Sequence, residues 1–177
     1  LFGKLFPYSP IIIGFSENEL ENTVVLIQKG HKFTEMSKID SLIPLIEAFH
    51  ELEFLKKPRI FVFRDSESYY QRSVSKARFC AFYNGDIVIS PWALQEVERG
   101  EIDLEIYLRH ELSHSLLHQH SGIIRASGYP AWLLEGIAVY SADQMGTSWY
   151  PSKEETYQYI AEGNYMPPDY FKTKKEE

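Results

Sequence analysis

Short runs of apolar residues, separated by polar and turn-forming residues, occupy the first half of the chain. These runs are rich in β-branched and aromatic residues, a composition typical of strands. They predict strands at residues 11–15, 23–28, 59–64, 77–83 and 86–90. We expect the first two strands to pair as a hairpin. The last two flank Asn84-Gly85, a sequence that strongly favours a two-residue hairpin turn.

Helical periodicity appears between these strands. Apolar residues spaced three and four apart predict an amphipathic helix across residues 37–55, and a shorter helix is expected at 67–73. Ser90 and Pro91 favour the start of another helix, because serine caps helix N-termini and proline suits the first turn. Gly100 is expected to end that helix.

Two longer helical patterns occupy the second half of the chain. The first covers residues 102–119 and has the apolar spacing of a helix packed on a core. Its apolar positions are Ile102, Ile106, Leu108, Leu112, Leu116 and Leu117. The second opens at Tyr129-Pro130, where proline suits the first helical position. It continues through Trp132, Leu133, Leu134, Ile137, Ala138 and Val139.

Strands mixed with helices, followed by helices alone, indicate an α+β fold with a small mixed sheet and a helical C-terminal part. The chain has 177 residues, of which 44% are hydrophobic and 24% are charged, as is usual for one soluble globular domain. We therefore expect a single domain across residues 1–177. Within it, residues 1–35 are expected to form an N-terminal extension and residues 164–177 a disordered tail.

Charge and cysteine content narrow the classes of partner and site. A formal charge of −7 disfavours nucleic acid and anionic membrane, so we expect neither as a partner. Cys80 is the single cysteine, so neither an intramolecular disulfide nor a cysteine-based zinc site is expected. The chain begins at Leu1, and we expect upstream residues to have been removed. Export or membrane tethering is one hypothesis for its location, which the sequence leaves open.

The first of the two long helices contains the sequence HELSH at residues 110–114. Helical residues four apart lie on one face about 5.4 Å from each other, so His110 and His114 can present imidazole nitrogens to one metal ion. Glu111 is rotated by roughly 100° from His110 and borders that face without binding the ion. Two solvated histidines on a helix surface are the alternative interpretation of so short a motif.

The second long helix offers a third ligand, Glu135, which follows His114 by 21 positions. Catalytic zinc takes three protein ligands and keeps one position open for water. A glutamate inside so apolar a helix is costly to bury alone, and a divalent cation compensates its charge. We therefore predict one zinc ion per chain, held by His110, His114 and Glu135.

These motifs resemble those of the gluzincin metallopeptidases, in which a two-histidine helix is followed by a helix that supplies a glutamate. Residues 132–138, WLLEGIA, are similar to the pattern of the aminopeptidase branch and of the wider peptidase MA-like group. Residues 81–85, AFYNG, are similar to the edge strand beside the substrate cleft of thermolysin-like enzymes. The resemblance covers roughly residues 58–143 and implies a zincin-like catalytic core, with its edge strand packed on helices.

The resemblance implies a zinc-dependent endopeptidase that acts on peptide or protein substrates. Glu111 would be the general base, and Ala81 and Phe82 of the edge strand would bind the substrate backbone. An ordinary sheet edge is the alternative for that strand. Cys80 replaces the asparagine that holds the substrate in thermolysin-like enzymes. No acidic motif for a free amino terminus precedes His110, so exopeptidase activity is not expected.

Two other functions remain open. A metal-containing binding or scaffold domain would keep the fold without turnover, but the presence of Glu111 disfavours it, since loss of the base is the simplest way to abandon catalysis. A zinc hydrolase that acts on a non-peptide amide would use the same residues.

His120 offers a rival third ligand, because it lies ten residues after His110, where metzincins place their last histidine. Metzincins need a glycine at the intervening bend, whereas this chain has Leu117, a good helix former. We expect the helix to continue and to carry His120 away from the metal. His118 lies about 12 Å along the helix from His110, so His118 and His120 are both expected to be solvated.

Two supporting roles are unassigned by the sequence. Gluzincins stabilise the oxyanion with a tyrosine or histidine beyond the glutamate, and the candidates here are Tyr140, Tyr150, Tyr157, Tyr159, Tyr165 and Tyr170. A carboxylate that orients a ligand histidine is also expected. Asp143 is the nearest candidate, with a simple surface position as the alternative.

Overall fold

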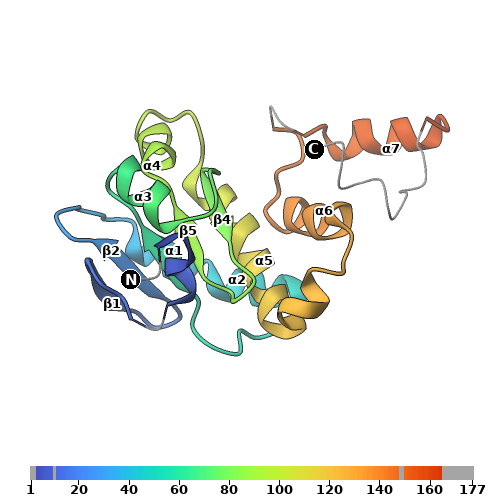
Figure 1. Ribbon diagram of the computed structural model, residues 1–177. Helices are drawn as coiled ribbons and strands as arrows, with labels where there is room; N and C mark the ends of the chain where they lie inside the picture. Colours follow the sequence, from blue (N-terminus) through green and yellow to red (C-terminus); the bar gives the residue numbers. More distant parts are fainter. Residues whose placement is uncertain (1–2, 10, 148–149, 165–177) are drawn as a thin grey trace.

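The computed structural model describes residues 3–9, 11–147 and 150–164 (Figure 1). One five-stranded mixed sheet lies at its centre and has the strand order β1-β2-β3-β5-β4. Its strands are β1 (Phe15–Glu19), β2 (Val24–Gln28), β3 (Arg59–Val62), β4 (Phe79–Ala81) and β5 (Ile87–Ile89). The three central strands are parallel, whereas β1 and β4 pair antiparallel at the two edges. The predicted α+β class and small mixed sheet are therefore confirmed.

Seven α-helices and one 3-10 helix, η1 (Gly3–Tyr8), accompany the sheet in the described part of the chain. The α-helices are α1 (Met36–Ser41), α2 (Ile43–His50), α3 (Ser66–Arg72), α4 (Pro91–Glu98), α5 (Leu104–Ala126), α6 (Ala131–Ser141) and α7 (Lys153–Ala161). α6 and α7 lie beyond α5, on the side away from β1 and β2 (Figure 1). Within the described residues, no helix is both long and apolar enough to cross a membrane.

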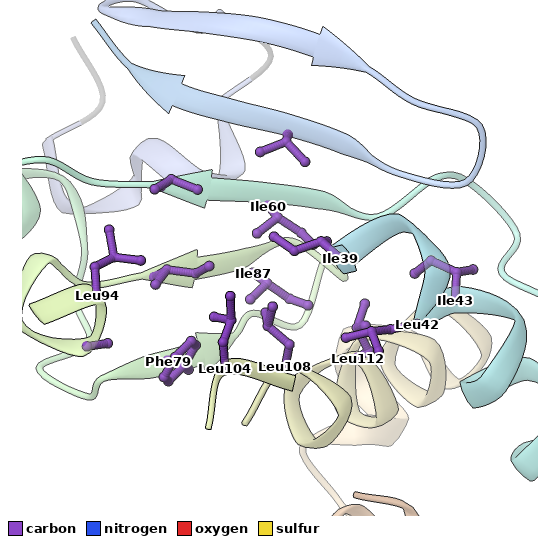
Figure 2. Close-up of a cluster of buried hydrophobic side chains, with 14 of the residues drawn as sticks. Ile39, Leu42, Ile43, Ile60, Phe79, Ile87, Leu94, Leu104, Leu108 and Leu112 are labelled. Carbon is purple, nitrogen blue, oxygen red and sulfur yellow. The ribbon is translucent and has the colours of Figure 1, made fainter. Parts of the chain in front are cut away.

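The main core fills the space between the sheet and the helices α1, α2 and α5. The central strands are almost wholly apolar because both faces of the sheet are covered. Figure 2 shows Ile60 and Ile87 of the sheet above Leu108 of α5, with Leu112 next to Leu42. All five of these side chains are buried. This packing fixes how α5 is rotated against the sheet.

An aromatic cluster covers the opposite face of the sheet and ties the N-terminal segment to it. Neighbouring rings in this cluster have centroids between 5.1 and 5.7 Å apart, mostly edge to face, as aromatic pairs prefer. The rings belong to Phe6, Phe15, Phe61, Phe63 and Tyr69.

The first predicted strand is displaced. Residues 11–15 were expected to be extended, but β1 begins only at Phe15 and continues through the polar residues that follow it. Ile11 and Ile13 are both exposed. Gly14 adopts a left-handed φ of 86°, which turns the chain before the strand starts. Pairing with β2, and not burial of an apolar run, therefore determines where this edge strand lies.

The predicted helix across residues 37–55 is wrong in its continuity, because two short helices, α1 and α2, take its place. Pro44 lies in the first turn of α2. A proline has no N–H to donate, and its ring clashes with the carbonyl four residues earlier. α2 then ends at His50, and the next residue, Glu51, adopts a left-handed φ of 53°.

The predicted hairpin between β4 and β5 is confirmed, but its turn differs. The N–H of Phe82 donates to the carbonyl of Asp86 at 2.7 Å, and the N–H of Gly85 donates to the carbonyl of Phe82 at 2.8 Å. The loop therefore has three residues, with Gly85 at a left-handed φ of 83°. This is the second common hairpin geometry, a turn followed by one left-handed residue.

The other predicted elements lie near their expected positions. Ser90 caps α4 by accepting a hydrogen bond from the N–H of Ala93 at 3.1 Å, and Gly100 follows the end of that helix at a φ of 69°. The predicted tail at residues 164–177 lies, apart from Asn164, outside the described residues.

Candidate metal centre

α5 carries the HELSH motif and owes its orientation to an apolar stripe on one side. Its four core-facing leucines, all buried, are Leu104, Leu108, Leu112 and Leu116. Asp103 accepts a hydrogen bond from the N–H of Glu105 at 2.7 Å, as capping residues do at helix N-termini. The helix extends past its predicted end at residue 119, with a break at Gly122. Because the leucines face the sheet, Glu111 is turned towards β4, and His110 and His114 are turned towards α6.

α6 positions Glu135 opposite the histidines of α5. The helix begins directly after Pro130, which has an extended backbone with a φ of −65° and so precedes the first helical position that the sequence predicted for it. At its other end, the Arg109 guanidinium of α5 donates to the carbonyl of Ser141 at 2.6 Å. A cation at a helix C-terminus is favoured by the helix dipole. This contact therefore joins α6 to α5 close to the site.

Three predicted ligands converge. Nε2 of His110 lies 3.2 Å from one carboxylate oxygen of Glu135, and Nε2 of His114 lies 3.3 Å from the other. The two imidazole nitrogens are 3.1 Å apart. Ligand atoms placed tetrahedrally about 2.0–2.1 Å from a zinc ion are roughly 3.3–3.4 Å from one another. The three side chains therefore fit a single small ion, and each offers one donor atom within 4.8 Å of the other two.

The centre is closed on its histidine side and open on its glutamate side. The side chains of His110 and His114 are 12% and 10% exposed, whereas that of Glu135 is 43% exposed. A ligand could therefore approach beside Glu135 and not through the core.

Gln144 is a supporting residue that the sequence did not reveal. Its Oε1 lies 2.9 Å from Nδ1 of His110, and the residue is buried just beyond the end of α6. An amide oxygen only accepts hydrogen bonds, so Nδ1 of His110 must carry the proton. Nε2 then keeps its lone pair for a metal. Asp143, the nearest candidate for this role in the sequence, has the alternative surface position, 3.7 Å from Lys153.

Charge within the cluster favours a cation. Hydrogen bonds with His110, and then with His114, hold the pKa of Glu135 well below its usual range. Burial alone would lower the pKa of His110, but the hydrogen bond to Glu135 and the nearby charge of Glu111 outweigh burial and raise it. The cluster thus stabilises positive charge between its members, whether that charge is a proton or a metal ion.

The side chain of Glu111 extends from α5 to the edge strand β4. The backbone N–H of Ala81 donates to its carboxylate at 2.6 Å. Burial raises the pKa of Glu111, against the lowering influence of His110 and His114. A carboxyl group with a raised pKa is suited to taking up and releasing a proton near neutral pH.

β4 presents one row of backbone groups to β5 and a second row to the open edge of the sheet. Arg78 and Phe82 form their backbone hydrogen bonds on the β5 side, at 2.9 and 2.7 Å. In an antiparallel ladder the direction of the backbone groups alternates, so Cys80 also faces β5, whereas Phe79 and Ala81 point their N–H and C=O groups the other way. Ala81 uses this outward direction to bond Glu111, and the backbone of Phe79 faces the same open edge.

Both predicted substrate-binding residues border the hollow towards the β4–β5 turn, but only Ala81 is hydrogen-bonded to a residue of the centre. Ala81 contacts Glu111 through its backbone. Phe82 is buried, and its ring packs edge to face against Tyr8 with the centroids 5.5 Å apart. Its carbonyl lies 3.1 Å from Nδ1 of His118.

Two hollows meet at the centre. One, of about 340 Å³, lies towards Arg78 and Tyr150, and the other, of about 490 Å³, lies towards the β4–β5 turn. Both are bordered by Phe79, His110, Glu111 and Glu135. The site is therefore accessible along β4 from both directions.

Tyr150 is the oxyanion candidate that lies beside the centre, in the hollow that His110 and Gln144 also border. Tyr140 lies elsewhere, with its ring 5.9 Å from that of Phe49. Two other candidates, Tyr157 and Tyr159, are exposed on α7, and Tyr165 and Tyr170 lie outside the described residues.

The neighbouring histidines differ from expectation in one case. His118 was expected to be solvated but is 7% exposed, because the hairpin turn covers it. Its ring stacks on that of His114 at a centroid distance of 6.0 Å. His120 is exposed as predicted, and its Nε2 lies 2.8 Å from the carbonyl of Glu53, away from the cluster.

Glu135 and not His120 therefore completes the cluster in this structure. Comparison of the chain with protein-family models, curated proteins and solved structures found no match, so the character of the centre rests on its own geometry.

Proposed function

We propose that this chain is a zinc-dependent endopeptidase of the gluzincin type, with a zincin-like catalytic core. The observation that carries the proposal is the convergence of His110, His114 and Glu135 beside a half-buried Glu111 that is hydrogen-bonded to an open edge strand. Isolated histidine pairs on helices are common, but they do not usually bring a third ligand and a carboxyl base with them.

Zinc suits the donor set. Two imidazole nitrogens and one carboxylate oxygen form the ligand set of many catalytic zinc sites, which leave a fourth position for water. The exposed side of Glu135 gives that position access to the hollows. When bound, zinc would supply an acidified water molecule and a Lewis acid that polarises the substrate carbonyl.

Glu111 would perform the proton transfers. Its carboxylate takes a proton from the attacking water and passes it to the amine that leaves. The hydrogen bond from Ala81 holds the carboxylate in place at 2.6 Å while the raised pKa favours uptake of the proton. Tyr150 borders the same hollow and would donate a hydrogen bond to the developing oxyanion.

The edge strand would hold the substrate. Outward backbone groups of β4 can pair with an extended peptide, as in other cases of strand addition. The hollows on both sides of the centre suit a chain that continues past it in both directions. We therefore favour cleavage at interior bonds over stepwise release of terminal residues.

Metal analysis of native protein tests the ligand assignment. Wild type is expected to hold about one zinc ion per chain, and His114→Ala and Glu135→Ala are expected to lose it. His120→Ala, on the same helix as His114, is the matched control and should keep its zinc. Zinc retained by Glu135→Ala but lost by His120→Ala would overturn the proposed ligand set.

Cleavage of an internally quenched peptide tests the reaction. A peptide acetylated at its amino terminus and amidated at its carboxyl terminus should be cut at an interior bond at least as fast as its free-ended counterpart. Stepwise release of residues from the free peptide, together with resistance of the blocked one, would exclude the endopeptidase assignment.

A further inference from the structure

Three half-exposed tyrosines surround the hollow beside the β4–β5 turn. Tyr8, Tyr83 and Tyr129 are 37%, 42% and 44% exposed, and all three border this hollow of about 490 Å³. Their rings come from three separate parts of the chain: η1, the hairpin turn, and the connection between α5 and α6. Large aromatic surfaces left half-open around a concave site are typical of ligand pockets.

Tyr8 is held firmly at the edge of this hollow. The carbonyl of Pro7 accepts hydrogen bonds from the side chain of Asn84 at 3.1 Å and from Arg59 at 3.3 Å. Arg59 is itself paired with the buried carboxylate of Asp86 in the hairpin. These contacts connect η1 to the turn, so Tyr8 is a fixed part of the hollow.

The hollow leads directly to the metal centre. The ring of Tyr83 lies 5.0 Å from that of His118, centroid to centroid. His118 in turn stacks on the ligand candidate His114. A side chain bound among the tyrosines would therefore belong to a residue close to the bond that Glu111 acts on.

The residues that border this hollow disfavour a charged substrate side chain. Apart from Glu111, Glu135 and the histidines of α5, the described residues that border the hollow have no charged side chain. Besides the tyrosines, they include Val74, Phe79, Ala126 and Leu134. The two glutamates would also repel an acidic side chain. Large apolar side chains of a substrate would gain the most binding free energy here, because they bury their surface against aromatic rings.

We propose that Tyr8, Tyr83 and Tyr129 form a subsite that selects a large apolar, preferably aromatic, residue of the substrate beside the cleaved bond. This inference depends on the proposed endopeptidase function and adds a substrate class to it. It also gives the N-terminal segment a role in specificity, through Tyr8.

The test uses two blocked peptides and two measurements. The peptides are acetylated and amidated and have the same glycine, serine and alanine sequence, except that one carries a single phenylalanine where the other carries alanine. Cleavage by the zinc-loaded protein gives kcat and KM, and fluorescence anisotropy of labelled peptides gives binding to the Glu111→Gln protein. We expect wild type to favour the phenylalanine peptide by about tenfold in kcat/KM, mainly through KM.

Tyr8→Ala should remove most of that preference. The phenylalanine peptide should lose about fivefold or more in kcat/KM, whereas the alanine peptide should stay within about twofold of wild type. Tyr8→Phe should keep the preference, because the ring and not the hydroxyl provides the surface. Tyr157→Ala, which removes an exposed tyrosine of α7, is the matched control. Tyr83→Ala provides a second variant if Tyr8→Ala fails to fold.

Each outcome separates the subsite from the endopeptidase function. Equal losses for both peptides in Tyr8→Ala and Tyr83→Ala would mean that the tyrosines are structural, and the subsite would be rejected. Cleavage without preference for phenylalanine would reject the subsite and leave the endopeptidase intact. Binding of the phenylalanine peptide that depends on Tyr8, without any cleavage by wild type, would support the subsite and reject the endopeptidase. Neither binding nor cleavage would reject both.

Discussion

At the scale of single residues, the contacts of Glu111 separate it from the three candidate metal ligands. His110 and His114 face Glu135 of α6. Glu111 is turned to β4 and accepts a hydrogen bond from the N–H of Ala81. Its carboxylate is therefore held at the edge strand, apart from the three candidate ligands.

Replacing Glu111 by glutamine should separate catalysis from metal binding. Glutamine keeps the size of the side chain but does not accept a proton at neutral pH, so we expect kcat to fall by about 10²–10⁴ while zinc content stays at one ion per chain. Glu105→Gln, at a half-exposed position of the same helix, is the control. Zinc loss in Glu111→Gln would show that this residue is a ligand.

Gln144 should set the affinity for the metal through His110. Gln144→Leu removes the acceptor of the Nδ1 proton, and loss of such a partner typically weakens zinc binding by about 10–100-fold. Competition with a chromogenic chelator would measure the change, with Asp143→Asn as the neighbouring control. An unchanged affinity in Gln144→Leu would contradict the orienting role.

The sequence could predict the site residues that belong to a recognisable motif, but not those whose residue type carries no such signal. The histidines and Glu135 were predictable, because a histidine pair four apart, followed by a glutamate in so apolar a helix, is typical of a metal site. Gln144 was not, since an ordinary polar residue after a helix carries no local signal, and its contact depends on the left-handed Asp143 that turns the chain back. His118 was assigned to solvent because nothing on its own helix indicates that the hairpin turn covers it.

At the scale of elements, the hairpin β4–β5 is attached to α5 at several successive positions. Glu111 bonds Ala81, Ser115 donates to the carbonyl of Gly85 at 2.5 Å, and His118 bonds Phe82. These contacts fix the distance between α5 and the edge strand β4.

Two glycine variants test how close that attachment is. Gly85→Ala and Gly100→Ala both place a side chain at a left-handed φ, which costs roughly 1–2 kcal/mol. A Cβ at Gly85 would also lie 2.8 Å from Cγ of Gln119, whereas a Cβ at Gly100 would meet open space. Gln119 cannot move away easily, because its side-chain amide is hydrogen-bonded to both the N–H and the C=O of Lys56. Urea denaturation should therefore show that Gly85→Ala is the more destabilised by about 1 kcal/mol. Equal destabilisation of the two variants would argue against tight packing at the turn.

The sequence predicted the type of most elements better than their limits. Pro44 was a visible signal for the break between α1 and α2, but the apolar periodicity on both sides of it outweighed that signal. The edge strand β1 could not be located from burial, since its residues are mostly polar and exposed. The strand order was also beyond prediction, because parallel pairs such as β2 and β3 join residues that are far apart in the chain.

At the scale of the whole molecule, burial of histidines should make stability depend on pH. Burial lowers the pKa of His50 and of His118. The unfolded chain protonates these imidazoles near pH 6.5, whereas the folded chain resists protonation, so the unfolded state binds more protons below that pH. Their contribution is thus constant above about pH 6.5 and falls as the pH decreases.

The contribution of His118 can be isolated by difference. In metal-free protein, the loss of stability between pH 7.5 and 5.5 should be smaller for His118→Gln than for wild type, as measured by urea denaturation. His120→Gln, at an exposed position, should behave as wild type. A larger loss in His118→Gln would reverse the sign of the assignment.

α5 packs in the core and also carries the two histidines of the cluster. α6 has few buried residues, so the contacts of Glu135 matter more for its position. Of the eleven residues of α6, only Ala138, Val139 and Ser141 are buried, and the helix packs on α5. A metal bound by Glu135 and the two histidines would add a strong connection between these helices, worth about 2.7 kcal/mol when the free metal is at 100 times its dissociation constant. The fold would thus contain two units of unequal stability. Chelation should accelerate amide hydrogen exchange in α6 while β3 and β5 stay protected, and α6 would open as a separate cooperative unit that the ion keeps closed.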